Sequence, residues 1–262
     1  MKKTVRKILS LMLAAAFIAS VVVTANPTEV SAKNKYKKGD YITFGSYEQD
    51  GDTSNGAEPI EWEVLAVKNG KALVISKYIL DSKPYNETWD NVTWEICTLR
   101  KWLNKDFYDS AFNDSEKNKI VNTKISNPDN KIDGTDGGKA TKDNVFLLSV
   151  SEIQKYYKIK KWNKDYMESY LQALMTEGTQ YATDNGLFTY TMTKADYKEY
   201  YNSQGYKKNC IGRTCGGWWL RSPGSTSIAA CDVSDSGLVG WGYCGGVASD
   251  ITGVRPAMWI EM

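Results

Sequence analysis

The chain has 262 residues, with 33 basic and 31 acidic side chains and no histidine. The absence of histidine excludes Ser-His-Asp and Cys-His catalysis and metal sites built on imidazole. The charges nearly balance and the lysines form only short clusters, so we expect no nucleic-acid partner, because such binding needs a concentrated basic surface.

Residues 1–32 have the layout of a secretory signal peptide. Residues 1–7 carry four basic side chains and no acid, residues 8–25 are almost wholly apolar, and small-residue sites end at Ala25 and Ala32. An uncleaved membrane anchor is the alternative, because the apolar run approaches the roughly 18–20 residues of a membrane span. We expect cleavage after Ala32, and therefore a protein that is secreted or held at the cell surface.

The expected mature chain, residues 33–262, is predicted to form a single domain without a membrane span. Cleavage removes four of the 33 basic residues and one of the 31 acids, which leaves 29 against 30. The slight basicity of the whole chain therefore belongs to the leader and not to the working domain.

The first part of the domain predicts a β-hairpin. Strands are expected at 41–45, 60–67 and 71–77, and the second of them alternates apolar and acidic residues, which indicates one buried face. Asn69-Gly70 between the last two is a strong hairpin signal.

The middle of the chain predicts mainly helices. We expect them at 98–107 with Thr98 as the cap, at 113–119, at 151–157 with Ser151 as the cap, at 163–177 and at 193–201. The apolar run Val145–Leu148 predicts a buried strand.

Helical periodicity stops in the last 50 or so residues. Short strands are expected at 218–221, 229–233, 239–243 and 254–260, with a turn at Ser234–Gly237. A hairpin, then helices, then a β-rich C-terminal segment indicates an α+β fold.

The five cysteines are an odd number, so at least one thiol is left without a partner in the chain. Export permits disulfides, and two sequence-local pairs, Cys210–Cys215 and Cys231–Cys244, are the candidates. Cys97 is expected to be a buried thiol.

A loop at 127–142 contains oxygen ligands of the kind that calcium prefers. Its candidates are Asp129, Asn130, Asp133 and Asp136. The spacing is not that of an EF-hand, and an ordinary turn-rich loop is the alternative interpretation.

Several short motifs follow one another along the chain, namely Gly39–Gly45, Pro59–Trp62, Leu99–Asn104 (LRKWLN), Val145–Ser149, Trp218–Gly224 (WWLRSPG) and Gly253–Ala257 (GVRPA). Together and in this order they resemble an uncharacterised bacterial family, domain of unknown function 6273. The resemblance spans nearly the whole expected mature chain.

That family is in turn distantly similar to the C-type-lectin-like fold, in the branch that includes formylglycine-generating enzymes. The resemblance implies a single α+β domain whose C-terminal strands and loops present a binding surface. The function it favours is a ligand-binding module for an extracellular glycan, peptide or protein. The candidate binding residues are Trp219, Arg221, Asp232, Asp235, Trp241 and Tyr243.

Other interpretations stay open. Arg221 and Arg255 are also candidates for buried tethers to carboxylates or backbone. The spacing of Cys210 and Cys215 resembles the thiol pair of formylglycine-generating enzymes, so a copper-dependent oxidase is an alternative function. A structural or adhesive surface protein without a small ligand is another.

Overall fold

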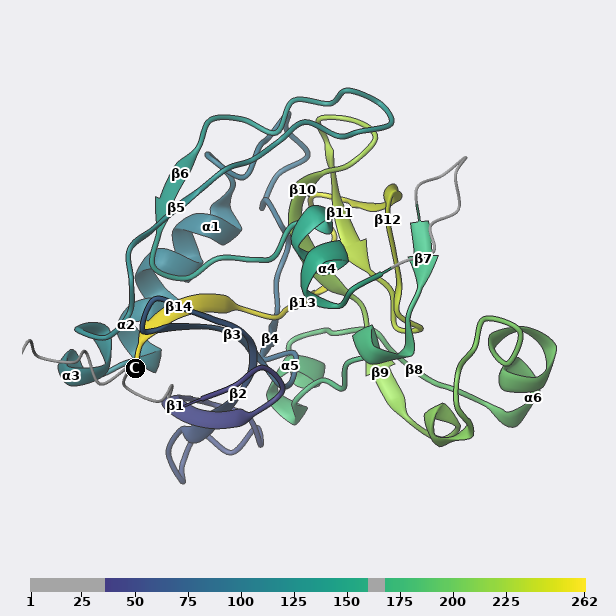
Figure 1. The fold of residues 1–262 in the computed structure, drawn as a ribbon, viewed down its shortest axis with the longest axis horizontal. Helices are drawn as coiled ribbons and strands as arrows, with labels where there is room; N and C mark the ends of the chain where they lie inside the picture. The colour runs from purple at the N-terminus through teal and green to yellow at the C-terminus, as the bar shows by residue number, and fades with distance from the viewer. Residues whose placement is uncertain (1–35, 160–167) are drawn as a thin grey trace, which may run out of the picture. The chain divides into compact units, whose positions relative to one another are not determined.

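The computed structural model describes residues 36–159 and 168–262, which belong to one compact unit, Asn34–Met262. The expected signal peptide, residues 1–32, lies outside the described residues. No helix within the described ranges is long and apolar enough to cross a membrane. Helices mix with largely antiparallel strands, so the α+β class is confirmed (Figure 1).

The N-terminal hairpin and the last strand of the chain form one antiparallel sheet, in the order β1-β2-β3-β14. Ile60, Trp62 and Val64 alternate along β2 and are fully buried, because alternate strand residues share a face. Asn69 and Gly70 have φ of 51° and 73°, values that a two-residue hairpin turn requires, so the predicted hairpin is confirmed. The strands are β1 (Tyr41–Tyr47), β2 (Glu58–Lys68), β3 (Lys71–Ser76) and β14 (Ala257–Glu261).

The β-rich C-terminal segment builds most of a second sheet, in the order β4-β13-β10-β11-β12-β7. Strands β10, β11 and β12 pair as successive antiparallel neighbours, and β13 joins β10 in parallel, with Trp218 opposite Gly253. Every residue of β10 is buried, so it lies in the core of the protein. The strands are β4 (Asp81–Ser82), β7 (Glu168–Tyr170), β10 (Trp218–Pro223), β11 (Ala229–Val233), β12 (Leu238–Gly246) and β13 (Gly253–Val254).

Short helices and two small ladders cover the two sheets. Asn113, Ser149 and Thr193 each form a capping box with the residue three positions later, which fixes where α3, α4 and α6 begin. The helical segments are α1 (Thr98–Trp102), η1 (Leu103–Phe107), α2 (Tyr108–Ala111), α3 (Asp114–Lys117), α4 (Val150–Tyr156), η2 (Gln172–Leu174), α5 (Gln180–Asp184), α6 (Lys194–Asp196), η3 (Tyr197–Tyr201) and η4 (Lys208–Cys210). The ladders pair β5 (Thr123–Ile125) with β6 (Thr141–Asp143), and β8 (Thr189–Thr191) with β9 (Thr214–Gly216).

Two predicted elements are wrong. Val145–Leu148 is buried but is not a strand, since Phe146 alone makes an isolated bridge, to Ala257. The helix expected at 163–177 is replaced, in its described part, by β7 and the single turn η2. Pairing of β7 with β12 outweighs the local helical spacing there.

The predicted helix caps Thr98 and Ser151 are also wrong. Cys97 caps α1, with its sulfur accepting a hydrogen bond from the Arg100 amide, and Ser149 caps α4. Each cap lies one or two residues before the position that we expected, which is the usual uncertainty of helix ends.

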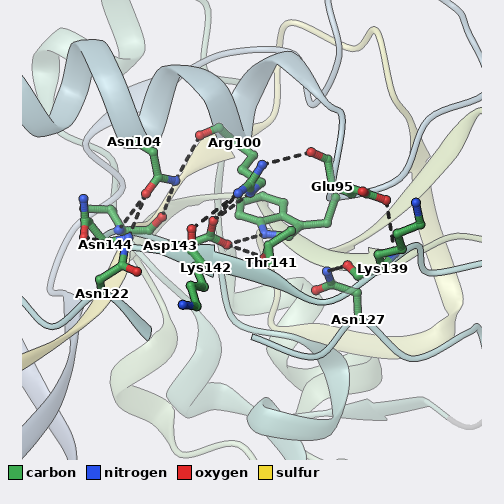
Figure 2. Close-up of polar contacts among 12 residues, drawn as sticks. Glu95, Arg100, Asn104, Asn122, Asn127, Lys139, Thr141, Lys142, Asp143 and Asn144 are labelled. Atoms are coloured by element: carbon green, nitrogen blue, oxygen red, sulfur yellow. Dashed lines mark hydrogen bonds and ion pairs between the residues drawn. The ribbon is translucent and has the colours of Figure 1, made fainter. Parts of the chain in front are cut away.

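A buried polar network fastens α1 to β6 (Figure 2). The Asp143 side chain is completely buried and accepts hydrogen bonds from Arg100 Nε at 2.7 Å, Trp94 Nε1 at 2.9 Å and the Thr141 hydroxyl at 2.7 Å. One turn later, Asn104 donates to the Val145 carbonyl and accepts from the Asn144 amide. The LRKWLN motif therefore supplies two side chains that hold the segment after β6 in place.

Candidate functional site

A pocket of about 180 Å³ opens on the C-terminal sheet. Its lining comes from the approach to β8, the start of β10, the end of β11, the turn after it, β12 and the approach to β13. The Gly253 amide donates to the Gly217 carbonyl at 2.8 Å, which holds the starts of β10 and β13 together beneath it. The lining residues are Phe188, Gly217, Asp232, Ser234, Asp235, Tyr243, Ile251 and Thr252.

Three of the six predicted binding residues meet in this pocket, namely Asp232, Asp235 and Tyr243. Asp232 ends up there because it sits opposite Trp219 in the β10–β11 ladder, one residue before the chain leaves β11 for the turn. Tyr243 reaches the same pocket from β12. The antiparallel pairing of β11 with β12 thus brings Asp232 and Tyr243 to the same pocket.

The Asp232 carboxyl group is the most unusual group in the lining. It is only 9% exposed, and its Oδ1 atom is buried without a hydrogen-bond partner. Burial raises its pKa to about 7, because a charged carboxylate loses its hydration there and gains little in return. A buried polar atom of this kind costs free energy of folding.

The neighbouring acids also lack a compensating positive charge. Burial raises the pKa of Asp235, and it raises the pKa of Tyr243 together with the nearby Asp232 and Asp235 carboxylates. No lysine or arginine is among the described residues that line the pocket, so the two acids face it without a cation from that part of the protein. The arrangement favours a ligand group that is positively charged or rich in hydrogen-bond donors.

The other three predicted binding residues lie in the core. Trp219 is fully buried and donates from Nε1 to the Lys83 carbonyl at 2.9 Å. Trp241 is 1% exposed, with the Lys131 amine 5.3 Å from its ring centroid. Trp241 and Tyr243 lie two residues apart on β12, on either side of an exposed glycine. Trp241 is packed inside and offers no surface to a ligand.

Arg221 is also inside the protein. Its Nη1 atom donates to the Leu147 carbonyl and to the Glu152 carboxylate, which in turn closes the capping box of α4. Arg221 therefore ties β10 to the start of α4. Arg255 is likewise buried and donates from Nε to the Ser76 carbonyl at 2.8 Å.

The predicted disulfides are not formed, since all five cysteines are free thiols. Cys231 and Cys244 face each other across β11 and β12, but the Cys231 thiol donates to the Pro223 carbonyl at 3.2 Å instead. Cys210 and Cys215 lie in one buried cluster, and burial raises both pKa values, that of Cys215 to about 11. Protonated thiols are poor copper ligands.

We expect alkylation of the native protein to label Cys244 first, because it is partly exposed and the other four cysteines are buried. All five thiols should react after unfolding without a reductant. Intact mass before and after unfolding gives both counts. Fewer than five labels in the unfolded protein would show that a disulfide forms in the purified chain.

In the loop that was a calcium candidate, three of the four candidate side chains accept hydrogen bonds from backbone amides. Asn130 accepts from the Ile132 and Asp133 amides, and Asp129 and Asp136 accept from the amides of Gly137 and Gly138. Among the described residues, the acids whose oxygens gather within 4.8 Å of one another are Glu48, Asp50 and Glu58, and not those of this loop.

Sequence reasoning missed the apolar part of the pocket. Phe188 and Ile251 are 56% and 51% exposed, and the Phe188 amide donates to the Ile251 carbonyl at 3.0 Å. That backbone contact joins segments some sixty residues apart, and no local pattern signals it. Ser234 and Thr252 were missed for the same reason, since each looks like an ordinary turn residue.

Comparison with known proteins gives one match. The family model described as "Domain of unknown function (DUF6273)" matches residues 69–262, which include the whole lining of the pocket. No curated protein matches the chain, and no solved structure does.

Proposed function

The chain belongs to the DUF6273 family, whose description assigns no activity, and on that premise we propose that it is a ligand-binding module acting outside the cell. Its Asp232 pocket receives an ammonium group of the ligand. The observation that carries this proposal is the buried Oδ1 atom of Asp232, which has no hydrogen-bond partner and no lysine or arginine beside it among the described residues of the pocket.

The preference for an ammonium group follows from the unmet hydrogen bond and the uncompensated charge of the Asp232 carboxylate. A ligand ammonium group would supply the missing hydrogen bond and compensate the buried negative charge. Tyr243 and Phe188 add aromatic rings, and such faces attract cations. A neutral hydroxyl could satisfy the hydrogen bond but not the charge, so an amine is favoured over a plain sugar.

The size of the pocket limits how much of the ligand enters. A volume of about 180 Å³ is below the roughly 300–1,000 Å³ of sites that bury a whole drug-sized molecule. It suits one head group of a longer ligand, such as a lysine side chain, a peptide amino terminus or the amine of an amino sugar. The exposed Phe188 and Ile251 side chains would then contact the remainder of that ligand.

Location and fold are part of the same proposal. The leader-like residues 1–32 support export, and the Trp-rich β10, the Ser-Asp-Ser-Gly turn and the final Val-Arg-Pro segment support a C-type-lectin-like arrangement. Such a surface would bind an extracellular peptide or glycan. A copper oxidase centred on Cys210 and Cys215 has no comparable support.

The test is a titration of the purified residues 33–262 with matched ligands at pH 7, where the ligand amines are still largely protonated, followed by calorimetry or NMR. Lysine amide peptides, glucosamine or both should bind, one more tightly than the other, whereas acetyl-lysine peptides and N-acetylglucosamine should not. The two amine sources separate a peptide ligand from a glycan. Asp232→Asn should abolish binding, and Asp250→Asn, outside the lining, should leave it unchanged.

Equal binding of free and acetylated amines, or binding that survives in Asp232→Asn, would refute the assignment of this pocket. The pH supplies an independent readout. Affinity for the lysine peptide, whose side-chain ammonium stays charged throughout this range, should rise between pH 6 and 8, because burial holds the pKa of Asp232 near 7 and the ionised form is the one that attracts the cation.

A further inference from the structure

A second and larger pocket, of about 420 Å³, lies where the first sheet, α4 and the segment around η2 meet. Its volume is within the range of sites that hold a whole small molecule. It shares no lining residue with the Asp232 pocket. Its lining consists of Tyr41, Glu63, Lys77, Tyr78, Tyr157, Gln172, Ala173, Met175, Thr176, Glu177, Arg213 and Arg255.

Two buried donors in this pocket have no acceptor among the described residues. Arg255 is 4% exposed, and its Nη1 atom donates to no acceptor there. The hydroxyl of Tyr157, at the C-terminal end of α4, is also buried, and its proton has no acceptor in that part of the chain. The Arg255 charge acts on the Tyr157 hydroxyl, lowering its pKa against the larger effect of burial, so the two groups are neighbours.

The rest of the Arg255 guanidinium is held firmly. Nε donates to the Ser76 carbonyl at 2.8 Å, and the group stacks 5.0 Å from the Trp218 ring centroid. Nη2 lies 3.8 Å from the Glu63 carboxylate, a long contact that leaves the charge incompletely matched. The Nη1 edge is therefore fixed in position while its hydrogen-bonding capacity stays unused.

The other charges at the pocket are already paired. The Lys77 amine donates to Glu61 at 2.7 Å and lies 4.9 Å from the Tyr78 ring centroid. Arg213 pairs with Glu177 at 3.1 Å and donates to the Met175 carbonyl. Arg255 and Tyr157 are therefore the lining groups whose donors still lack a hydrogen-bond acceptor among the described residues.

We propose that this pocket is a second binding site, specific for a carboxylate-bearing small molecule whose oxygens accept from Arg255 Nη1 and the Tyr157 hydroxyl. A carboxylate supplies two acceptor oxygens in one plane, which matches a guanidinium edge and an adjacent hydroxyl. The rings of Tyr41 and Tyr78 in the lining provide surfaces for the body of the ligand. The site is independent of the amine pocket and would stand if that proposal failed.

The experiment compares acids with their neutral counterparts on residues 33–262 at pH 7. Glucuronate is set against glucose, and N-acetyltyrosine against N-acetyltyrosinamide, with Kd measured by NMR or calorimetry. At least one acid should bind, and its neutral counterpart should not. Which acid binds distinguishes a sugar acid from a peptide carboxyl terminus.

Tyr157→Phe removes the hydroxyl without changing the ring and should weaken binding about tenfold or more, as expected for a hydrogen bond to a charged group. Tyr156→Phe is the matched control, because Tyr156 is outside the lining, and it should bind as the unmodified protein does. Asp232→Asn should also leave this binding unchanged. Binding lost only in Asp232→Asn would assign the acid to the other pocket.

Arg255→Lys keeps a charge but not the planar edge, so it should bind weakly even where it folds normally. Absence of binding by both acids would overturn the proposal. An unchanged Kd in Tyr157→Phe would do so as well.

Discussion

Replacing Asp143 with alanine is expected to lower the free energy of unfolding by about 3–5 kcal/mol, the usual effect of removing one partner of a buried ion pair. The change leaves the Arg100 guanidinium, the Trp94 indole N–H and the Thr141 hydroxyl without their shared acceptor. All three belong to the network that fastens α1 to β6 (Figure 2). For a domain of this size the midpoint of thermal unfolding should fall by roughly 10 °C.

Asp109→Ala is the matched control, because Asp109 also accepts from two cationic side chains, Lys105 and Lys117, but on the surface. Its effect on thermal unfolding should be small, since water and salt screen such pairs. A combined Asp143→Leu and Arg100→Met variant should recover part of the loss, because it removes both charges of the pair and leaves neither unmatched. A midpoint for Asp143→Ala no lower than that for Asp109→Ala would contradict the structural role of the network.

The elements that the sequence predicted well are those with strong local signals. The Asn69-Gly70 turn needs left-handed backbone, and the alternation in β2 follows from one buried face, so both could be read without knowledge of the fold. The C-terminal strands and the Ser234–Gly237 turn were also placed to within a few residues. The apolar run Val145–Leu148 correctly predicted burial but not the backbone conformation, because strand pairing depends on neighbours distant in sequence.

The candidate site was predictable only in part. Asp232, Asp235 and Tyr243 were found because polar and aromatic residues near a turn between strands commonly face a ligand. Trp219 and Trp241 were misleading, because aromatic rings serve the core as readily as a binding surface, and burial decides which. Tyr157 carried no sequence signal, since its significance depends on Arg255, nearly a hundred residues away.

The Asp232→Asn variant is expected to be more stable than the unmodified protein above pH 7, by up to about 4 kcal/mol. Burial raises the pKa of Asp232 from 3.8 in the unfolded chain to about 7 in the folded protein. The folded state thus keeps a proton that the unfolded state has lost, and stability falls as the pH rises from about 4 to 7. The two pKa values differ by about three, and each pH unit is worth 1.36 kcal/mol.

Urea unfolding of both proteins at several pH values between 4 and 8 measures this difference. The two curves should converge near pH 4 and separate steadily up to pH 7, because asparagine does not titrate. Asp235→Asn should show a smaller separation, since Asp235 is only half buried and its carboxylate is stabilised by the Ser236 amide. Parallel curves would mean that Asp232 is ionised at no cost and has found a partner within the protein. If Asp232→Asn is more stable and also loses amine binding, the loss of binding cannot be the result of unfolding. That outcome would show that the carboxylate serves its ligand and lowers the stability of the fold.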